Sequence, residues 1–167
     1  FEATAARRMK LRPMETSTPL TPSSGSATLP SDYLGYRRLT CTASTRTELL
    51  YVHPSYLQAL YPAGISDIPR YFTIEGSAIK TRSSDSNTLE LLYYAKNSAI
   101  SSALNWLFTN HPDAYLFGAL AESGGFTDDT EKLGLWSARR DAVFDEIKLS
   151  DFRERGQMHI RVGGAHP

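Results

Sequence analysis

The stretch from Asn105 to Leu120, NWLFTNHPDAYLFGAL, constrains the fold more than any other, because it is nearly uncharged and contains a helix start signal. Pro112 fixes φ near the helical value and lacks the N–H that a first helical turn cannot satisfy internally. The preceding His111 is pushed towards extended backbone, and Asp113 adds negative charge where the helix dipole favours it. The pattern predicts a helix over residues 112–124.

This helix has two apolar sides that differ in the size of their side chains. At about 100° per residue, large residues gather on one side and small ones on the other. The large side comprises Tyr115, Leu116, Ala119 and Leu120, and the small side comprises Ala114, Gly118 and Ala121. The large side suits an ordinary core, whereas the small side permits close approach of another backbone. Two interpretations remain open: a central helix of one compact core, or a small side that contacts a neighbouring subunit.

Length and composition indicate an ordinary soluble protein. The chain of 167 residues is 41% hydrophobic and 22% charged, enough for one domain with a core. Eighteen basic residues balance eighteen acidic ones, so no overall field attracts nucleic acid or membrane. The lone Cys41 excludes an intrachain disulfide or a cysteine-based metal cluster. The chain starts at Phe1 in a helix-like segment, and we expect it to be a piece of a longer product.

The segments before residue 105 predict a short helix followed by strands. Residues 1–12 have helical composition and end at Pro13. Residues 15–28 are rich in Ser, Thr and Pro, which favours extended structure with little core contact. Residues 36–42 and 47–52 predict strands, and the alternation in residues 71–82 and 89–94 predicts a three-stranded antiparallel meander with a turn at Gly76-Ser77.

A second long helix is predicted over residues 128–149, after Gly124-Gly125. Its large apolar residues share one face at helical spacing: Leu133, Trp136, Val143, Phe144 and Ile147. Leu135, Arg139 and Ala142 lie on the far face, a mixed surface suited to a subunit contact.

Beyond Gly156 the tail has the period of a strand. Met158, Ile160 and Val162 alternate with His159 and Arg161. Such a segment could add a strand to the sheet edge of another protein, or it could be a disordered tail.

The chain lacks the common enzymatic signatures. There is no phosphate-binding GxxxxGK[ST] loop, GxGxxG, HExxH or GxSxG motif, and the four histidines lack metal-ligand spacing. We therefore predict no catalytic site, cofactor or metal. The basic cluster of Arg7, Arg8, Lys10 and Arg12 could contact DNA phosphates or form a solvated helix face.

Several segments resemble the head-to-tail adaptor proteins of tailed bacteriophages. NWLFTNHPDAYLFGALAE, followed by a helix with a central Trp136, is similar to that family's Asn-Trp-Leu segment, Pro-Asp helix start and Tyr-x-x-Gly-Ala-Leu helix. RRMKLRPMET resembles the end of the family's first helix, LPSDYLGYRRLT its first sheet segment, and YFTIEGSAIKTR with LELLYYAK its hairpin and next strand. The likeness runs from about residue 6 to residue 145 in the right order, although Gly124-Gly125 replaces a more helical stretch.

Together, the patterns and the resemblance predict an α+β fold. A helical bundle of residues 1–12, 112–124 and 128–149 carries an inserted antiparallel sheet region over residues 26–95. One adaptor domain covers residues 1–155, and residues 156–167 form an extended docking tail.

The resemblance implies a structural virion protein in the neck between capsid portal and tail, assembled in the host cytoplasm. Many copies, dodecameric in the family, would form a ring that continues the DNA channel, binds the portal and a tail or nozzle protein, and contacts packaged DNA transiently. By analogy the portal contact is assigned to Met158, His159, Ile160, Arg161 and Val162. The subunit contact is assigned to Ala114, Gly118, Ala121, Leu135, Arg139 and Ala142. The sheet tips near residues 19–26 or 83–87 are candidates for the tail-side contact, and a sequence-independent DNA-binding module using the basic cluster is the alternative function.

Overall fold

The computed structural model of the chain describes residues 1–43, 46–84, 87–101, 104–123 and 130–154. The chain divides into two compact units, which we call the helical unit (residues 1–11 and 99–167) and the sheet unit (residues 12–98). A single adaptor domain over residues 1–155 stays a prediction.

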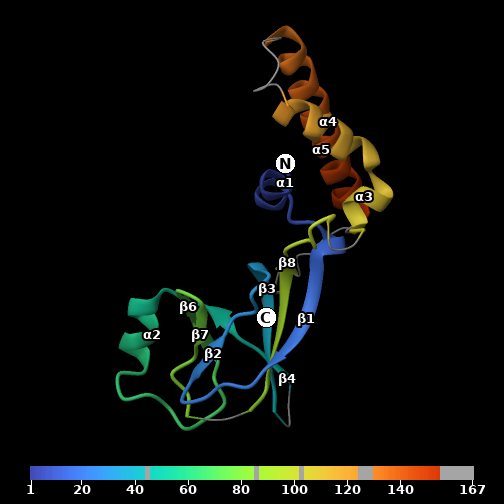
Figure 1. Cartoon of the computed structure of the whole chain (residues 1–167). Coiled ribbons are helices and arrows are strands. Elements are labelled where there is room, and N and C mark those ends of the chain that lie inside the picture. Colours follow the sequence, from blue (N-terminus) through green and yellow to red (C-terminus); the bar gives the residue numbers. More distant parts are fainter. Residues whose placement is uncertain (44–45, 85–86, 102–103, 124–129, 155–167) are drawn as a thin grey trace, which may run out of the picture. The chain divides into compact units, whose positions relative to one another are not determined.

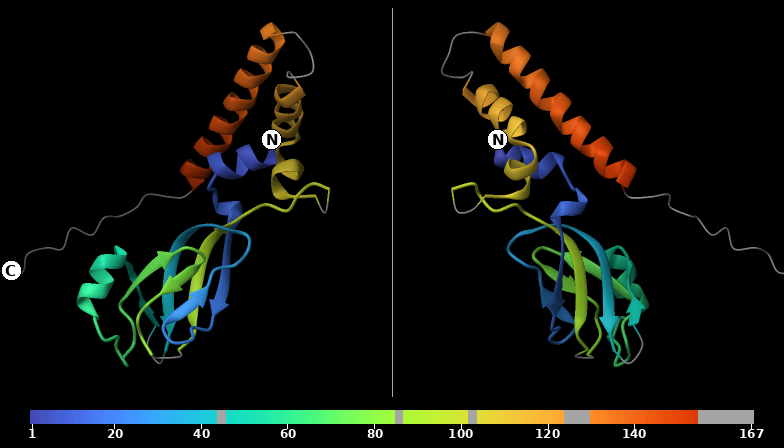
Figure 2. Two further views of the ribbon diagram at one scale, coloured as in Figure 1. Left: turned by 60° about the vertical axis from the view of Figure 1, so that its left-hand side comes forward. Right: turned by 90° about the vertical axis from the view of Figure 1, so that its right-hand side faces the viewer.

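The described part of the helical unit contains four α-helices (Figure 1): α1 (Glu2–Arg8), α3 (Trp106–Asn110), α4 (Pro112–Ser123) and α5 (Thr130–Glu154). The predicted helix start at Pro112 is confirmed. Helix α4 packs along α5, as both views of Figure 2 show. Helix α5 extends past the predicted end at residue 149, whereas α1 is shorter than predicted.

A polar network joins three helices of this unit. The Asn105 side chain caps α3 by accepting a hydrogen bond from the Phe108 N–H at 3.0 Å. The same side chain donates to the Tyr115 hydroxyl on α4 at 2.6 Å, and that hydroxyl donates to the Glu2 carboxylate on α1 at 3.1 Å. Because Asn105 is buried, its satisfied amide orients α3 against α4.

Among its described residues, the sheet unit contains two four-stranded sheets. The first has the order β1 (Glu15–Leu20), β8 (Leu89–Ala95), β3 (Tyr33–Thr42), β4 (Arg46–Glu48). The second has the order β2 (Ser26–Thr28), β7 (Ala78–Lys80), β6 (Tyr71–Glu75), β5 (Leu50–Tyr51). The 3-10 helix η1 (Arg12–Met14) precedes β1, and α2 (Pro54–Leu60) contacts β6.

Side chains of both sheets enclose one buried core. Leu39 and Leu91 come from the first sheet, and Phe72 and Ile79 from the second, all four fully buried. Burial of each such side chain contributes about 1.5–3 kcal/mol before entropy losses. The sheet unit therefore has a core of its own, made by strands distant in sequence.

The predicted fold class, a helical bundle with one inserted antiparallel sheet, is wrong. The β6–β7 hairpin forms as predicted, with Glu75 opposite Ala78. Strand β8, however, pairs with β1 and β3 in the other sheet, and β5 pairs with β6 in parallel. Residues 15–20, expected to have little core contact, form an edge strand of the first sheet. Alternation identified the strands but not their partners, because pairing depends on segments far apart in the chain.

Candidate interaction surfaces

Helix α5 exposes a row of apolar side chains on the side opposite its buried face. Phe144 and Ile147 are buried. The exposed row, which we call the α5 stripe, consists of Leu135, Ala138, Ala142, Leu149 and Phe152. Its three largest members are 53%, 49% and 74% exposed. These positions share one helix face, but the exposed charged side chains of Asp145 and Glu146 interrupt the row between Ala142 and Leu149.

The predicted contact residues on α5 are exposed. Leu135 and Ala142 belong to the α5 stripe, and Arg139 lies beside it. The Arg139 guanidinium stands 5.7 Å from the centre of the Phe117 ring on α4, a cation–π contact that holds its side chain over that helix. This surface is available to a partner.

The small side of α4 lies inside the helical unit. Ala114 is fully buried, and the Phe1 ring occupies the space that a side chain at Gly118 would fill. The large side, expected to face the core, includes Leu116 at 57% exposure. The Phe1 ring fills the space beside the small side chains of α4, which explains why small residues line this interior face. The centre of the Phe1 ring also lies 6.0 Å from the centre of the Phe144 ring. A subunit contact through Ala114, Gly118 and Ala121 stays a prediction.

The basic cluster is partly engaged within the chain. The Arg8 guanidinium donates to the Asp141 carboxylate at 2.6 Å and stands 5.5 Å from the centre of the Phe144 ring. The hydrogen bond from Arg8 is the main reason that the pKa of Asp141 lies below its usual value. Lys10 and Arg12 also take part in interactions, while Arg7 is exposed. DNA contact by this cluster stays a prediction.

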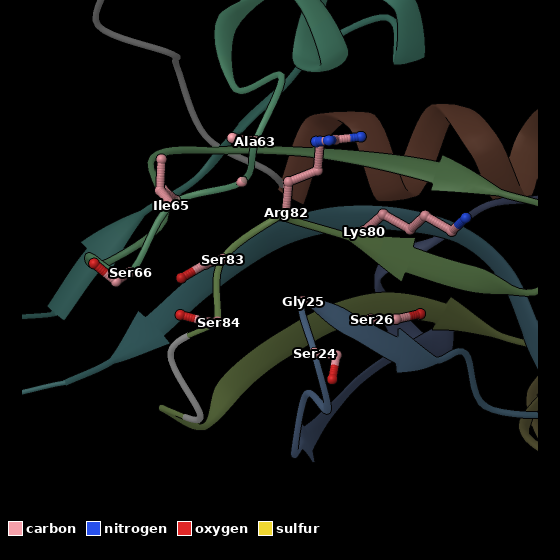
Figure 3. Close-up of a pocket in the computed structure, with 11 residues that line it drawn as sticks. Ser24, Gly25, Ser26, Ala63, Ile65, Ser66, Lys80, Arg82, Ser83 and Ser84 are labelled. Atoms are coloured by element: carbon pink, nitrogen blue, oxygen red, sulfur yellow. The ribbon is translucent and has the colours of Figure 1, made fainter.

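The sheet unit carries a pocket of about 820 Å³, shown in Figure 3. Its lining comes from the start of β2, the loop after α2, and β7 with its continuation. The lining residues are Ser24, Gly25, Ser26, Ala63, Gly64, Ile65, Ser66, Lys80, Arg82, Ser83 and Ser84. Residues 24–26 and 83–84, which belong to the two sheet tips expected to be candidates for the tail-side contact, therefore contribute to one pocket.

Backbone hydrogen bonds hold the walls of this pocket. The N–H of Ile65 donates to the Arg82 carbonyl at 2.9 Å, and the N–H of Ser84 donates to the Ile65 carbonyl at 2.7 Å. The N–H of Thr81 donates to the Gly25 carbonyl at 2.8 Å. The three segments are thus joined to one another, and the pocket is formed in advance of any ligand.

Comparison with known families identifies the chain. A sequence model of the family described as SU10 adaptor protein matches residues 2–163. This chain belongs to the SU10 adaptor protein family. The match confirms the resemblance to bacteriophage head-to-tail adaptors and supports a structural adaptor in the virion neck, a class that is typically non-enzymatic. No curated protein matches the chain.

In this adaptor, the predicted portal residues Met158, His159, Ile160, Arg161 and Val162 lie outside the described residues. Within the described ranges, no group of three or more His, Cys, Asp or Glu side chains could hold a metal ion. None of the helices described is long and apolar enough to cross a membrane.

The two cations of the pocket, Lys80 and Arg82, are not among the residues that the sequence of this adaptor predicted as functional. Lys80 and Arg82 lie on one face of β7 and its continuation, because the alternate residues Ile79 and Thr81 are buried. The period-two pattern of residues 78–82 contained this information. The approach of Gly25 and Gly64 to Arg82 and Ser83, however, is set by segments far apart in sequence.

Proposed function

We propose that this adaptor forms a homo-oligomeric ring below the portal, a dodecamer as in its family, and that the ring joins the phage head to the tail and continues the DNA channel. The family assignment supports the adaptor role. The α5 stripe supports self-association, because an exposed apolar row on a soluble helix is the surface that a neighbouring copy would cover.

The α5 stripe forms one side of the contact between adjacent copies in this proposal. Its large members lie at the spacing that inserts side chains between those of a facing helix. Arg139 lies at its edge and supplies a charged rim. Apolar centres with polar rims are typical of stable protein interfaces.

Substitution of the stripe tests self-association. Leu149→Glu places a charge in the apolar row, and Ser150→Glu adds the same charge at the next exposed position, outside the row. We expect Leu149→Glu to shift the full chain from ring to smaller species in mass photometry, and Ser150→Glu to leave the ring intact. A ring that persists in Leu149→Glu at the wild-type concentration dependence would exclude the stripe as the subunit contact.

Portal binding is assigned to the tail segment 158–162, whose strand-like alternation suits addition to a sheet edge of the portal. Deletion of residues 157–167 should leave a folded protein that no longer docks on portal particles. Docking is measured by imaging portal particles mixed with the full chain or the truncated chain. Equal occupancy by both chains would contradict the tail assignment.

A further inference from the structure

The pocket of the sheet unit has a one-sided charge. Lys80 and Arg82 are its only charged lining residues among those the structure describes, and most of the others are serines or glycines. Serine hydroxyls can donate hydrogen bonds to an anion. A concave site with cations, hydroxyl donors and no acidic side chain in its described lining suits a negatively charged ligand.

Both cations can still serve a ligand. Arg82 donates from Nε to the Tyr61 carbonyl and from Nη2 to the Pro62 carbonyl, each at 2.7 Å. A guanidinium carries further N–H donors, and these two bonds fix its position while the rest stay available. Lys80 pairs with Glu75 at 2.8 Å, but the two side chains are 45% and 41% exposed, so the pair is weak and an incoming carboxylate can displace it.

We propose that this pocket is the docking site for an acidic segment of the protein that binds the tail side of the adaptor, with a carboxylate held between Lys80 and Arg82. The identity of the partner rests on the proposed adaptor function. The pocket itself rests on the sheet unit alone, because all its lining residues belong to that unit.

A peptide fits this pocket better than duplex DNA. The volume of about 820 Å³ lies in the range of pockets that enclose a small ligand or a few side chains. Strong binding to DNA needs many cations that track the phosphate backbone, whereas this site offers Lys80 and Arg82 within a concave wall. The pre-formed walls also limit the ordering needed when an extended segment enters.

The test uses the full chain and a fluorescein-labelled, end-blocked peptide Gly-Glu-Glu-Gly, with Gly-Gln-Gln-Gly as the uncharged probe. Fluorescence anisotropy at low salt reports binding. Lys80→Gln should weaken binding of the acidic peptide by about twofold to fivefold, the range expected for one exposed charge pair. Glu75→Gln should strengthen binding of the acidic peptide by a similar factor, because this substitution removes the carboxylate that competes with the peptide for Lys80.

Arg38→Gln is the matched control, since it removes one exposed cation of the same unit from outside the pocket. It should leave the affinity unchanged. Equal weakening by Arg38→Gln and Lys80→Gln would show general attraction to the surface and overturn the proposal. So would equal binding of the uncharged peptide, no binding of either peptide, or no gain in Glu75→Gln.

A short DNA duplex serves as a competitor. Displacement of the peptide by DNA from the wild type but not from Lys80→Gln would assign the pocket to phosphate and overturn the acidic-segment proposal. Oligomeric state and portal docking are measured on the same variants and should not change. Absence of peptide binding by an unsubstituted chain that still forms the ring refutes the pocket alone, whereas peptide binding by an unsubstituted chain that forms no ring refutes the proposed function.

Discussion

Substitution of Gly25 by alanine tests how closely the segments of the pocket approach one another. Gly25 has φ of +73°, and a Cβ there would lie 2.7 Å from the carbonyl oxygen and 2.9 Å from the nitrogen of Ser83. Those are backbone atoms of a segment that Ile65 holds through the hydrogen bonds on either side. The obstacle therefore cannot rotate away as a side chain would.

The structure provides a graded set of controls. Gly76 has φ of +59° with open space around it, and Gly64 has φ of +80° with the Arg82 carbonyl oxygen 3.1 Å away. The left-handed conformation costs an alanine about 1–2 kcal/mol. This is the whole effect expected at Gly76. At Gly25 a forced shift of packed backbone adds about 1–3 kcal/mol, for a total of about 2–5 kcal/mol. Gly64→Ala should fall between the two.

Urea denaturation followed by far-UV circular dichroism measures these free energies of unfolding. Amide hydrogen exchange in β6 and β7 checks that the change belongs to the sheet unit, because exchange reports the opening of individual elements. Equal destabilisation by Gly25→Ala and Gly76→Ala would refute the close approach, since both would then reflect backbone conformation alone. A higher free energy of unfolding in Gly76→Ala would contradict the positive φ of Gly76, because alanine is strained in that conformation.

Three further substitutions test the helical unit. The lowered pKa of Asp141 gives stability that is present above about pH 4 and lost as the pH falls through the folded-state pKa. The ion pair between Asp141 and Arg8 is partly exposed, so Asp141→Asn should lower the free energy of unfolding by less than about 1 kcal/mol at pH 7. The same substitution should flatten the acid side of a curve of stability against pH, and an unchanged curve there would argue against the ion pair. Asn105→Ala removes the cap of α3 and the hydrogen-bond donor to the Tyr115 hydroxyl, so it should lower the free energy of unfolding by about 1–3 kcal/mol, measured by thermal unfolding. Unchanged stability would exclude the polar network. Phe144→Ala should cost about 3–5 kcal/mol, and a loss below about 1 kcal/mol would show that Phe144 does not anchor the core.

Local signals in the sequence predicted the elements that local chemistry determines. Pro112 begins α4 because its ring and missing N–H suit only the first turn of a helix. Gly76 has the positive φ expected for the first residue of the hairpin turn between β6 and β7. Both features depend on a few consecutive residues, so a single sequence was sufficient.

The arrangement of the elements depends on contacts that no local pattern contains. The alternation in residues 89–95 predicted a strand, yet β8 joins β1 and β3 rather than the adjacent β7. The small side of α4 predicted a close neighbour, and within the structure the ring of Phe1 lies there, more than a hundred residues away in the chain. The same limit applies to the pocket, where the pairing of β2 with β7 brings Gly25 close to Ser83.

The two units differ in the kind of interface that each can support. The helical unit exposes the apolar α5 stripe, and apolar surfaces are typical of permanent assemblies. The sheet unit offers a polar pocket in which Lys80 already has an exchangeable partner in Glu75, as expected for a contact that forms on a finished assembly. Since salt screens exposed charge pairs far more than apolar burial, raising the ionic strength should weaken the proposed tail-side docking before it affects the proposed ring. A ring that dissociates at salt concentrations where docking survives would show that the two surfaces have been assigned the wrong way round.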